Sequence, residues 1–218
     1  MLSTPKKPQR RTERRRDPEG TRQRLLQAAF REVYRYGFQG AAIDSILAAT
    51  NVTKGALYYH FQSKEALGHA IIEEIIAEIT SDRWMRPLGQ SKGRDPIDTL
   101  IGIVQAIPSL PADVKRGCPL VNLTQEMSLL DEQFRRRLEK IFEAWQDSIA
   151  AALREGQSSG AVRRDLVPEE AASFLIAMVE GYEVLAKNSQ DSRVLNTGTK
   201  NIVSWLNSLR PAAHGRRG

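Results

Sequence analysis

Residues 53 to 60 combine polar and aromatic side chains that suit contact with a polyanion. The run reads Thr53-Lys-Gly-Ala-Leu-Tyr-Tyr-His60. A hydroxyl and an ammonium stand at its leading end, where they can reach nucleic-acid bases or phosphates. Gly55 has no side chain, so the backbone there can approach another molecule closely. The two tyrosines and the histidine can hydrogen-bond phosphate oxygens, while Leu57 is expected to face inward and hold the run on its neighbours.

This run is predicted to be the third of three closely spaced helices. Apolar residues at helical spacing predict a first helix over about residues 21–36, which Gly37 ends. A second helix is predicted over about residues 43–49, and Asn51-Val52 is predicted to be a turn. Thr53 is a good N-cap for the third helix. Two short helices joined by so few residues are typical of a helix-turn-helix, whose later helix enters the DNA major groove.

The rest of the chain is also predicted to be helical. Ser63 is expected to cap a fourth helix that ends by about residue 80, and residues 87–93 to form a loop. No stretch alternates with period two for long enough to predict a strand, so the fold is expected to be all-α. The later helices are expected at about residues 97–107, 119–130, 134–156, 168–187 and 192–209.

The net charge of +6 is concentrated at the start of the chain. Residues 1–16 hold seven Lys or Arg and a single Glu, so the remainder is formally neutral. A basic arm ahead of a neutral body indicates contact with phosphates, and a solvated tail is the alternative. No long apolar run or secretory leader is evident, and the single cysteine cannot form an internal disulfide. These features predict a cytoplasmic protein without a membrane partner.

The run from Ile43 to Leu67 closely resembles the DNA-binding signature of the TetR family of bacterial regulators. It reads Ile43-Asp-Ser-Ile-Leu-Ala-Ala-Thr-Asn-Val-Thr-Lys-Gly-Ala-Leu-Tyr-Tyr-His-Phe-Gln-Ser-Lys-Glu-Ala-Leu67. The resemblance rests on many positions at fixed spacing, and the rest of the chain is similar only in helical architecture and length. It implies a homodimeric repressor that binds palindromic double-stranded operator DNA and is released by a small-molecule effector.

The resemblance also implies the residues that contact DNA. Lys64 matches a phosphate-contacting lysine. Family members usually carry a threonine where this chain has Ala42, so that phosphate contact is expected to be missing, with Ser45 or the basic arm compensating. The matched recognition-helix positions are Thr53, Lys54, Gly55, Tyr58, Tyr59 and His60.

The expected domain organisation follows from the same resemblance. It comprises a basic disordered arm (1–18), a helix-turn-helix domain (19–66), a ligand-binding and dimerisation domain (67–210) and a flexible tail (211–218). The last two helices are implied to pair with their twofold mates. Independently, the helix from Pro168 is apolar on nearly every face over residues 171–179, which predicts burial on all sides. The interface candidates are Met178, Tyr182 and Leu206.

A ligand pocket is expected among the helices that begin near residues 97, 119, 131 and 168. Core packing is the alternative reading for its aromatic and methionine candidates. Its amide candidates need a hydrogen-bond partner if they are buried, and a ligand could supply one. The candidate lining residues are Cys118, Asn122, Gln125, Phe142, Trp145 and Met178.

Cys118 allows two interpretations. It follows Lys115-Arg116-Gly117 and precedes a predicted helix start, and both features favour a reactive thiolate. The run from Arg116 to Leu123 also resembles the electrophile- and oxidant-sensing branch of the family. A small buried apolar side chain is the alternative, and the residue type favours it.

No motif in the sequence points to catalysis. There is no Gly-x-Ser-x-Gly, phosphate-cradling Gly-rich loop or His-Glu-x-x-His, and the three histidines form no evident metal cluster with Cys118. Neither an enzyme nor a cofactor or metal site is therefore predicted. A helical interaction module with a basic tail is the other alternative, which binding to random and palindromic DNA would separate from a specific regulator.

Overall fold

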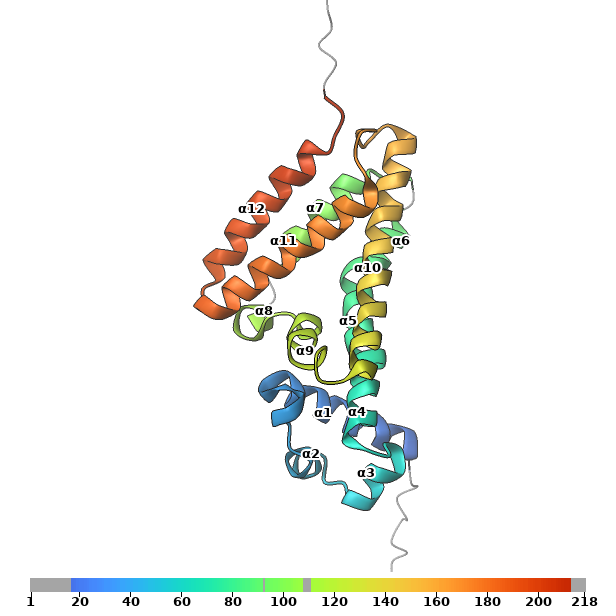
Figure 1. Ribbon diagram of the computed structural model, residues 1–218, viewed down its shortest axis with the longest axis vertical. Coiled ribbons are helices and arrows are strands. Elements are labelled where there is room, and N and C mark those ends of the chain that lie inside the picture. Colours follow the sequence, from blue (N-terminus) through green and yellow to red (C-terminus); the bar gives the residue numbers. More distant parts are fainter. Residues whose placement is uncertain (1–16, 92, 108–110, 213–218) are drawn as a thin grey trace, which may run out of the picture.

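The computed structural model describes residues 17–91, 93–107 and 111–212 (Figure 1). Within these ranges the chain forms helices and no strand, which confirms the all-α prediction. None of the described helices is long and apolar enough to cross a membrane. The predictions for the basic arm up to residue 16, and for the tail from residue 213, lie outside the described residues.

The first three helices form a small bundle, here called the head, at the lower end of Figure 1. They are α1 (Pro18–Gly40), α2 (Ile43–Thr50) and α3 (Lys54–His60). Asp17 caps α1, because its Oδ1 accepts the N–H of Gly20 at 3.0 Å. Leu25 of α1, Ile46 of α2 and Leu57 of α3 are buried in one shared core. Burial of that apolar face, more than local propensity, stabilises helices this short.

Helix α1 is interrupted at Gly37, where a helix end is predicted. Its φ of 79° and ψ of 168° lie in a region that is essentially open only to glycine. The chain then makes one more turn, to Gly40. The N–H groups of Phe38 and Gln39 donate to the Glu126 carboxylate at 2.7 and 2.8 Å. A side chain 88 positions away thus supplies the acceptors that the broken helix lacks.

One continuous helical rod runs from the head into the rest of the molecule. It consists of α4 (Lys64–Ala70), the π-helical η1 (Ile71–Ile76), α5 (Ala77–Thr80), π-helical η2 (Ser81–Met85) and α6 (Arg86–Gln90). The predicted loop over 87–93 is therefore wrong in its first half. Pro87 lies inside the rod, directly after η2, and has no N–H to donate to the preceding turn.

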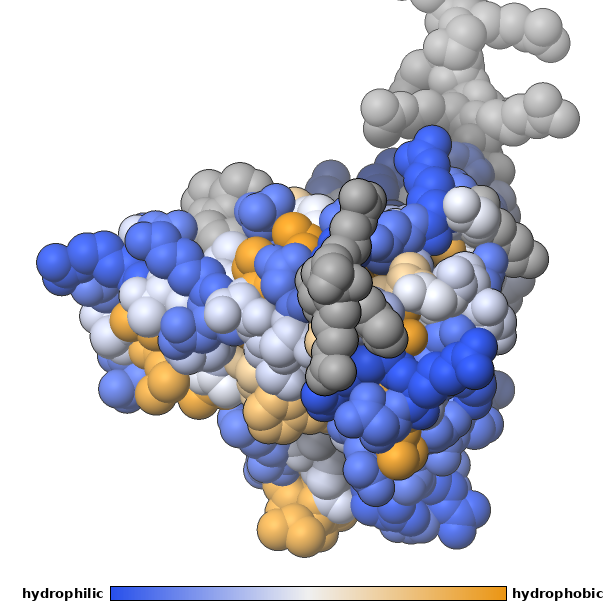
Figure 2. Space-filling view, turned by 90° about the horizontal axis from the view of Figure 1, so that it is seen from above, coloured by the Kyte–Doolittle hydropathy of each residue, from blue (hydrophilic) through white to orange (hydrophobic). Residues whose placement is uncertain are grey.

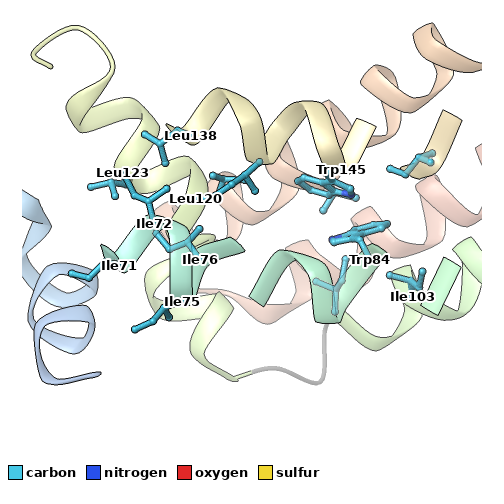
Figure 3. Packing of buried hydrophobic residues seen from close by; sticks show 14 of the residues in the cluster. Ile71, Ile72, Ile75, Ile76, Trp84, Ile103, Leu120, Leu123, Leu138 and Trp145 are labelled. Carbon is cyan, nitrogen blue, oxygen red and sulfur yellow. The ribbon is translucent and has the colours of Figure 1, made fainter. Parts of the chain in front are cut away.

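The π-helical turn η1 explains how four adjacent isoleucines are buried together. In an α-helix, a residue four positions further on is rotated by about 40° around the helix axis. Isoleucines spaced four apart would therefore turn gradually away from the core. The wider π turn reduces that drift. Ile71, Ile72, Ile75 and Ile76 are all buried, and they lie beside residues of α9 and α10 (Figure 3).

The remaining helices form the body. Figure 1 shows α10 alongside the rod, α11 and α12 side by side on the other flank, and α9 between them and the head. Trp84 and Trp145 face each other at its centre, with ring centroids 5.0 Å apart (Figure 3). The body helices are α7 (Pro96–Ala106), α8 (Pro111–Arg116), α9 (Pro119–Met127), α10 (Glu132–Ser159), α11 (Pro168–Ser189) and α12 (Ser192–Ser208).

Helix α10 ends later than the sequence predicts. It passes through Gly156 and stops at Ser159, and Gly160 adopts the left-handed conformation at its end. Gly156 has a packing role instead, since a Cβ there would lie 2.5 Å from a methyl of Val162 and 2.7 Å from Pro96. The local sequence does not distinguish Gly160, which ends the helix, from Gly156, which permits close packing.

Candidate nucleic-acid interface

The turn between α2 and α3 depends on one residue in the left-handed conformation. Asn51 has φ 52° and ψ 40°, a region that asparagine tolerates better than most residues. Val52 follows, and α3 begins at Lys54. This compact connection positions α3 across α2 in the geometry of a helix-turn-helix.

The inner face of α3 is firmly held. Leu57 is fully buried, as the sequence predicts, and Phe61, directly after the helix, is also in the core. The Arg22 guanidinium lies 5.1 Å from the Phe61 ring centroid and also binds the Glu74 carboxylate at 2.7 and 2.5 Å. Glu74 belongs to η1, so the Arg22–Glu74 ion pair links α1 to the rod on the inner side of α3.

The predicted recognition residues lie on the exposed side of α3. Thr53, Lys54 and Gly55 are exposed, and Tyr59 is 81% exposed. Tyr58 is 39% exposed, so its hydroxyl-bearing ring is more open than core packing would allow. The half-buried residue 60 is a histidine whose ring meets the Tyr59 ring edge-on at 5.1 Å. The structure thus brings a hydroxyl, an ammonium and two phenols to one short surface helix.

Thr53 and Gly55 show different local roles. The Thr53 Oγ1 accepts the N–H of Ala56 at 3.2 Å, so it caps α3 and keeps its own hydrogen available to donate. A Cβ on Gly55 would meet no atom within 4 Å. Packing within this chain therefore does not require glycine at that position.

Ser45 and Lys64 are placed differently by the structure. Ser45 is exposed in the first turn of α2, and Ala42 gives that helix no side-chain cap. Lys64 is half-buried, and its Nζ donates to the Gln39 carbonyl at 3.1 Å and lies 5.1 Å from the Phe38 ring centroid. Lys64 therefore also helps to hold the head together.

The predicted ligand-binding residues separate into two groups. Asn122 and Gln125 line a cavity of about 260 Å³ between α1 and the body. The Asn122 amide needs no ligand, because its Nδ2 donates to the Arg116 carbonyl at 2.6 Å and its Oδ1 accepts from Lys187 Nζ at 2.6 Å. Gln125 is exposed at this cavity. Neither side chain is therefore a buried amide that lacks a hydrogen-bond partner.

The other predicted pocket residues do not line that cavity. Trp145 is almost fully buried against Trp84, which is core packing. Phe142 and Met178 are half-buried and pack against the same core. The interface candidate Leu206 is fully buried within its own chain, so it presents no surface to a partner.

The surroundings of Cys118 support the second of its two interpretations, a small buried side chain. Burial raises the pKa of its thiol well above the ordinary value, and Glu180 and Glu183 raise it further. The Cys118 Sγ and one carboxylate oxygen each of Glu180 and Glu183 lie within 4.8 Å of one another. Arg83 Nη1 contacts Glu183 Oε1 at 3.1 Å. Burial and the acidic side chains of α11 therefore argue against the alternative of a reactive thiolate promoted by Lys115 and Arg116.

The sequence pattern missed several residues of the cavity. Glu126 gave no signal, since its role depends on the break at Gly37. The cavity's cations come from three helices that are far apart in the sequence, so no spacing links all of them, although two are adjacent residues of α8. They are Arg35, Lys115, Arg116 and Lys187.

Comparison with known proteins agrees with this geometry. Residues 25–71 match the family model described as bacterial regulatory proteins of the tetR family, and residues 96–202 match a tetracyclin repressor-like C-terminal domain. The chain is 33% identical over 160 residues to the HTH-type transcriptional repressor DhaR of Mycobacterium sp. strain GP1, covering 73% of this chain and 79% of that one.

Two solved structures share the fold over nearly their whole length. A TetR transcriptional regulator from Chloroflexus aurantiacus J-10-FL superposes with a TM-score of 0.79 at 25% identity, covering 90% of this chain and 98% of that one. The reduced form of E. coli NemR gives 0.77 at 25% identity, covering 89% and 100%.

The fold and the exposed α3 define the class of a helix-turn-helix DNA-binding regulator with an all-helical body. The chain belongs to the TetR family of bacterial transcriptional regulators, a family of regulators and not of enzymes.

Proposed function

We propose that this chain is a homodimeric repressor that binds a palindromic operator through α3 and leaves it when a small molecule binds. The observation that carries the proposal is the exposed run from Thr53 to Tyr59, fixed from behind by Leu57 and Phe61. A rigid helix with a polar exposed face fits a DNA major groove. The relative DhaR is named a transcriptional repressor, which supports repression over activation. Such a protein acts beside the bacterial chromosome, in the cytoplasm.

The proposed twofold interface uses the outer face of α11 with α12. Phe174 is 50% and Leu185 56% exposed, although both belong to a helix with an apolar sequence. The Phe174 ring meets Trp205 of α12 edge-on at 5.2 Å, so the apolar surface continues across both helices. Figure 2 shows several apolar patches, including on the left, the side where Figure 1 places these helices. A symmetric dimer would present two α3 helices about 34–36 Å apart, matching successive grooves.

The contacts between Glu126 and the break in α1 support transmission from body to head. The Tyr34 hydroxyl adds a second tie, since it donates to the Gly117 carbonyl at 2.6 Å. A ligand that alters the position of α9 would therefore move α1, and with it α3. Equal binding of the ligand to both arrangements would produce no release.

Gly55→Ala tests the proposed DNA contact without disturbing the chain's own packing. The operator is first selected from genomic fragments, and affinity is then measured by fluorescence anisotropy at several salt concentrations. We expect affinity for the selected site to fall by about 1–3 kcal/mol, roughly five- to 150-fold, because the added methyl meets DNA. The thermal midpoint should not fall, since the Cβ meets no atom of the protein.

Gly102→Ala is the matched control. It replaces an exposed glycine in α7 whose Cβ would likewise meet nothing within 4 Å, and it should leave DNA binding unchanged. Lys54→Ala should weaken binding to all sequences and reduce the salt slope by about one. Wild-type affinity in the Gly55→Ala protein, or equal binding to random and selected DNA, would reject the proposal.

A further inference from the structure

The cavity between head and body has a concentrated positive charge. Its walls come from α1 on the head side and from α8, α9 and α11 on the body side, and Ile76 of η1 also lines it. Arg35, Lys115, Arg116 and Lys187 line it together with a single carboxylate, that of Glu126. Both oxygens of Glu126 already accept backbone N–H groups of the head. Concave sites lined by one sign of charge concentrate ions of the opposite sign.

None of these four cations is paired with a carboxylate among the residues that the structure describes. Lys187 Nζ donates to the Asn122 amide oxygen at 2.6 Å, which leaves two ammonium hydrogens for another acceptor. The Arg116 guanidinium lies 5.6 Å from the Tyr34 ring centroid, a contact that leaves its N–H edge available. By contrast, the nearby Arg22 and Arg83 each contact a glutamate. The cavity's cations are thus available for a ligand.

Much of the remaining lining is apolar or aromatic. Phe30 and Val33 of α1 line the cavity together with Pro119 and Leu123 of α9. The Phe30 and Tyr34 rings stack at 5.5 Å, which gives α1 a flat aromatic surface there. An inorganic ion would leave this surface unused. At about 260 Å³ the cavity is at or below the roughly 300–1,000 Å³ of drug-sized sites, so its occupant is small.

We propose that this cavity binds a small organic anion, a carboxylate with a short apolar or aromatic tail. The carboxylate would lie between Arg116 and Lys187, where bidentate and point-charge contacts are both available. Its tail would lie between Phe30 and Leu123. The site would occupy the junction of head and body, not the centre of the body.

Occupation of this site bears on DNA binding. An anion there draws together cations of α8 and α11 and contacts α1, so it favours one arrangement of head on body. The bound arrangement would differ from the one that fits two successive grooves. The regulatory part of this inference rests on the proposed repressor function, whereas the anion site itself does not.

The test uses the full-length protein and three acids, butyrate, hexanoate and benzoate, each beside its neutral amide. Titration calorimetry measures binding, with inorganic phosphate as a further arm. We expect at least one acid to bind about tenfold or more tightly than its amide, and more tightly than phosphate. Arg116→Gln and Lys187→Gln should each remove most of that preference. Arg164→Gln, at an exposed arginine in the connection between α10 and α11, should not.

Operator binding is measured on the same samples. A selective acid should lower operator affinity in wild type and not in Arg116→Gln. Equal binding of acids and amides, no binding at millimolar concentration, or a preference for phosphate would overturn the anion site while the repressor proposal stood. A selective acid in a protein that shows no operator preference would reject the repressor proposal and leave the anion site intact.

Discussion

At the scale of single residues, the surroundings of a side chain decide its chemistry more than its neighbours in sequence do. Lys115 and Arg116 precede Cys118, yet burial and the two glutamates of α11 raise its thiol pKa. Thr53 is the opposite case, because its capping hydrogen bond to Ala56 is local and is predicted from residue type and position. Capping acts over three residues, whereas a pKa responds to every charge within several ångströms.

Cys118 is expected to be a slow nucleophile. At pH 7.5, iodoacetamide should alkylate it at least about tenfold more slowly than it alkylates the urea-unfolded chain, since each unit of pKa is tenfold in thiolate. Glu180→Gln should speed the reaction by removing one carboxylate that raises the thiol pKa. Equal rates in folded and unfolded protein would contradict this assignment.

The same thiol makes stability depend on pH. A pKa raised by folding gives stability that is present below the unfolded value, about 8.5, and lost as pH rises beyond it. The difference in free energy of unfolding between wild type and Cys118→Ala should therefore shrink between about pH 8 and 10. Urea titrations of both proteins across this range measure it, and a constant difference would argue against a shifted thiol.

At the scale of elements, the head contacts the body at the break in α1, through Glu126 of α9. Sequence signals predict where α1 breaks, because Gly37 adopts a conformation open only to glycine. They do not predict that Glu126 of α9 accepts the freed N–H groups. The two π-helical turns of the rod are likewise absent from the sequence pattern, and the four isoleucines of η1 lie beside α9 and α10.

Changes at the α1 break should cost measurable stability. Gly37→Ala is expected to destabilise the protein by about 1–3 kcal/mol, through backbone strain and a contact of 2.8 Å with Glu126. Glu126→Gln should cost about 1–3 kcal/mol, because one of two acceptors becomes a donor facing an N–H. Urea denaturation measures both. Glu143→Gln, at an exposed glutamate of α10, is the control, and an equal effect there would dismiss the specific contact.

The Arg22–Glu74 pair should contribute to stability in a pH-dependent way. The hydrogen bond from Arg22 lowers the pKa of Glu74, so its contribution is present above the unfolded pKa of about 4.5 and lost as pH falls. Both side chains are about a third exposed, which limits the pair to under about 1 kcal/mol. Arg22→Ala should destabilise at pH 7 and much less near pH 3. Arg31→Ala, exposed on the same helix, should show no such pH dependence.

At the scale of the whole molecule, the exposed apolar face of α11 and α12 supports the proposed dimer. The apolar sequence of α11 predicts burial on all sides, but Phe174 and Leu185 remain open in a single chain. A symmetric copy covers such a face with identical residues, and the same symmetry would space two α3 helices for a palindrome. A change that prevents dimer formation is therefore expected to weaken binding to the palindromic operator as well.

Leu185→Glu tests that link. A charge buried at the interface should raise the dimer dissociation constant by at least about tenfold, measured by analytical ultracentrifugation. Affinity for the full palindrome should fall with it, while far-ultraviolet circular dichroism stays helical. Leu129→Glu is the control, because Leu129 is 98% exposed in the turn before α10 and away from α11. Unaltered dimers in the Leu185 variant would place the interface elsewhere.

Local signals in the sequence determined most of the helices, the helix-turn-helix and the polar face of α3. Caps at Thr53 and Ser63 and the inward Leu57 act within a few residues, so their types and spacing suffice. Tertiary structure alone decided the setting of Cys118, the acceptor role of Glu126 and the cationic cavity. Each joins residues far apart in the chain, and electrostatic energy depends on distance in space, which residue spacing does not encode.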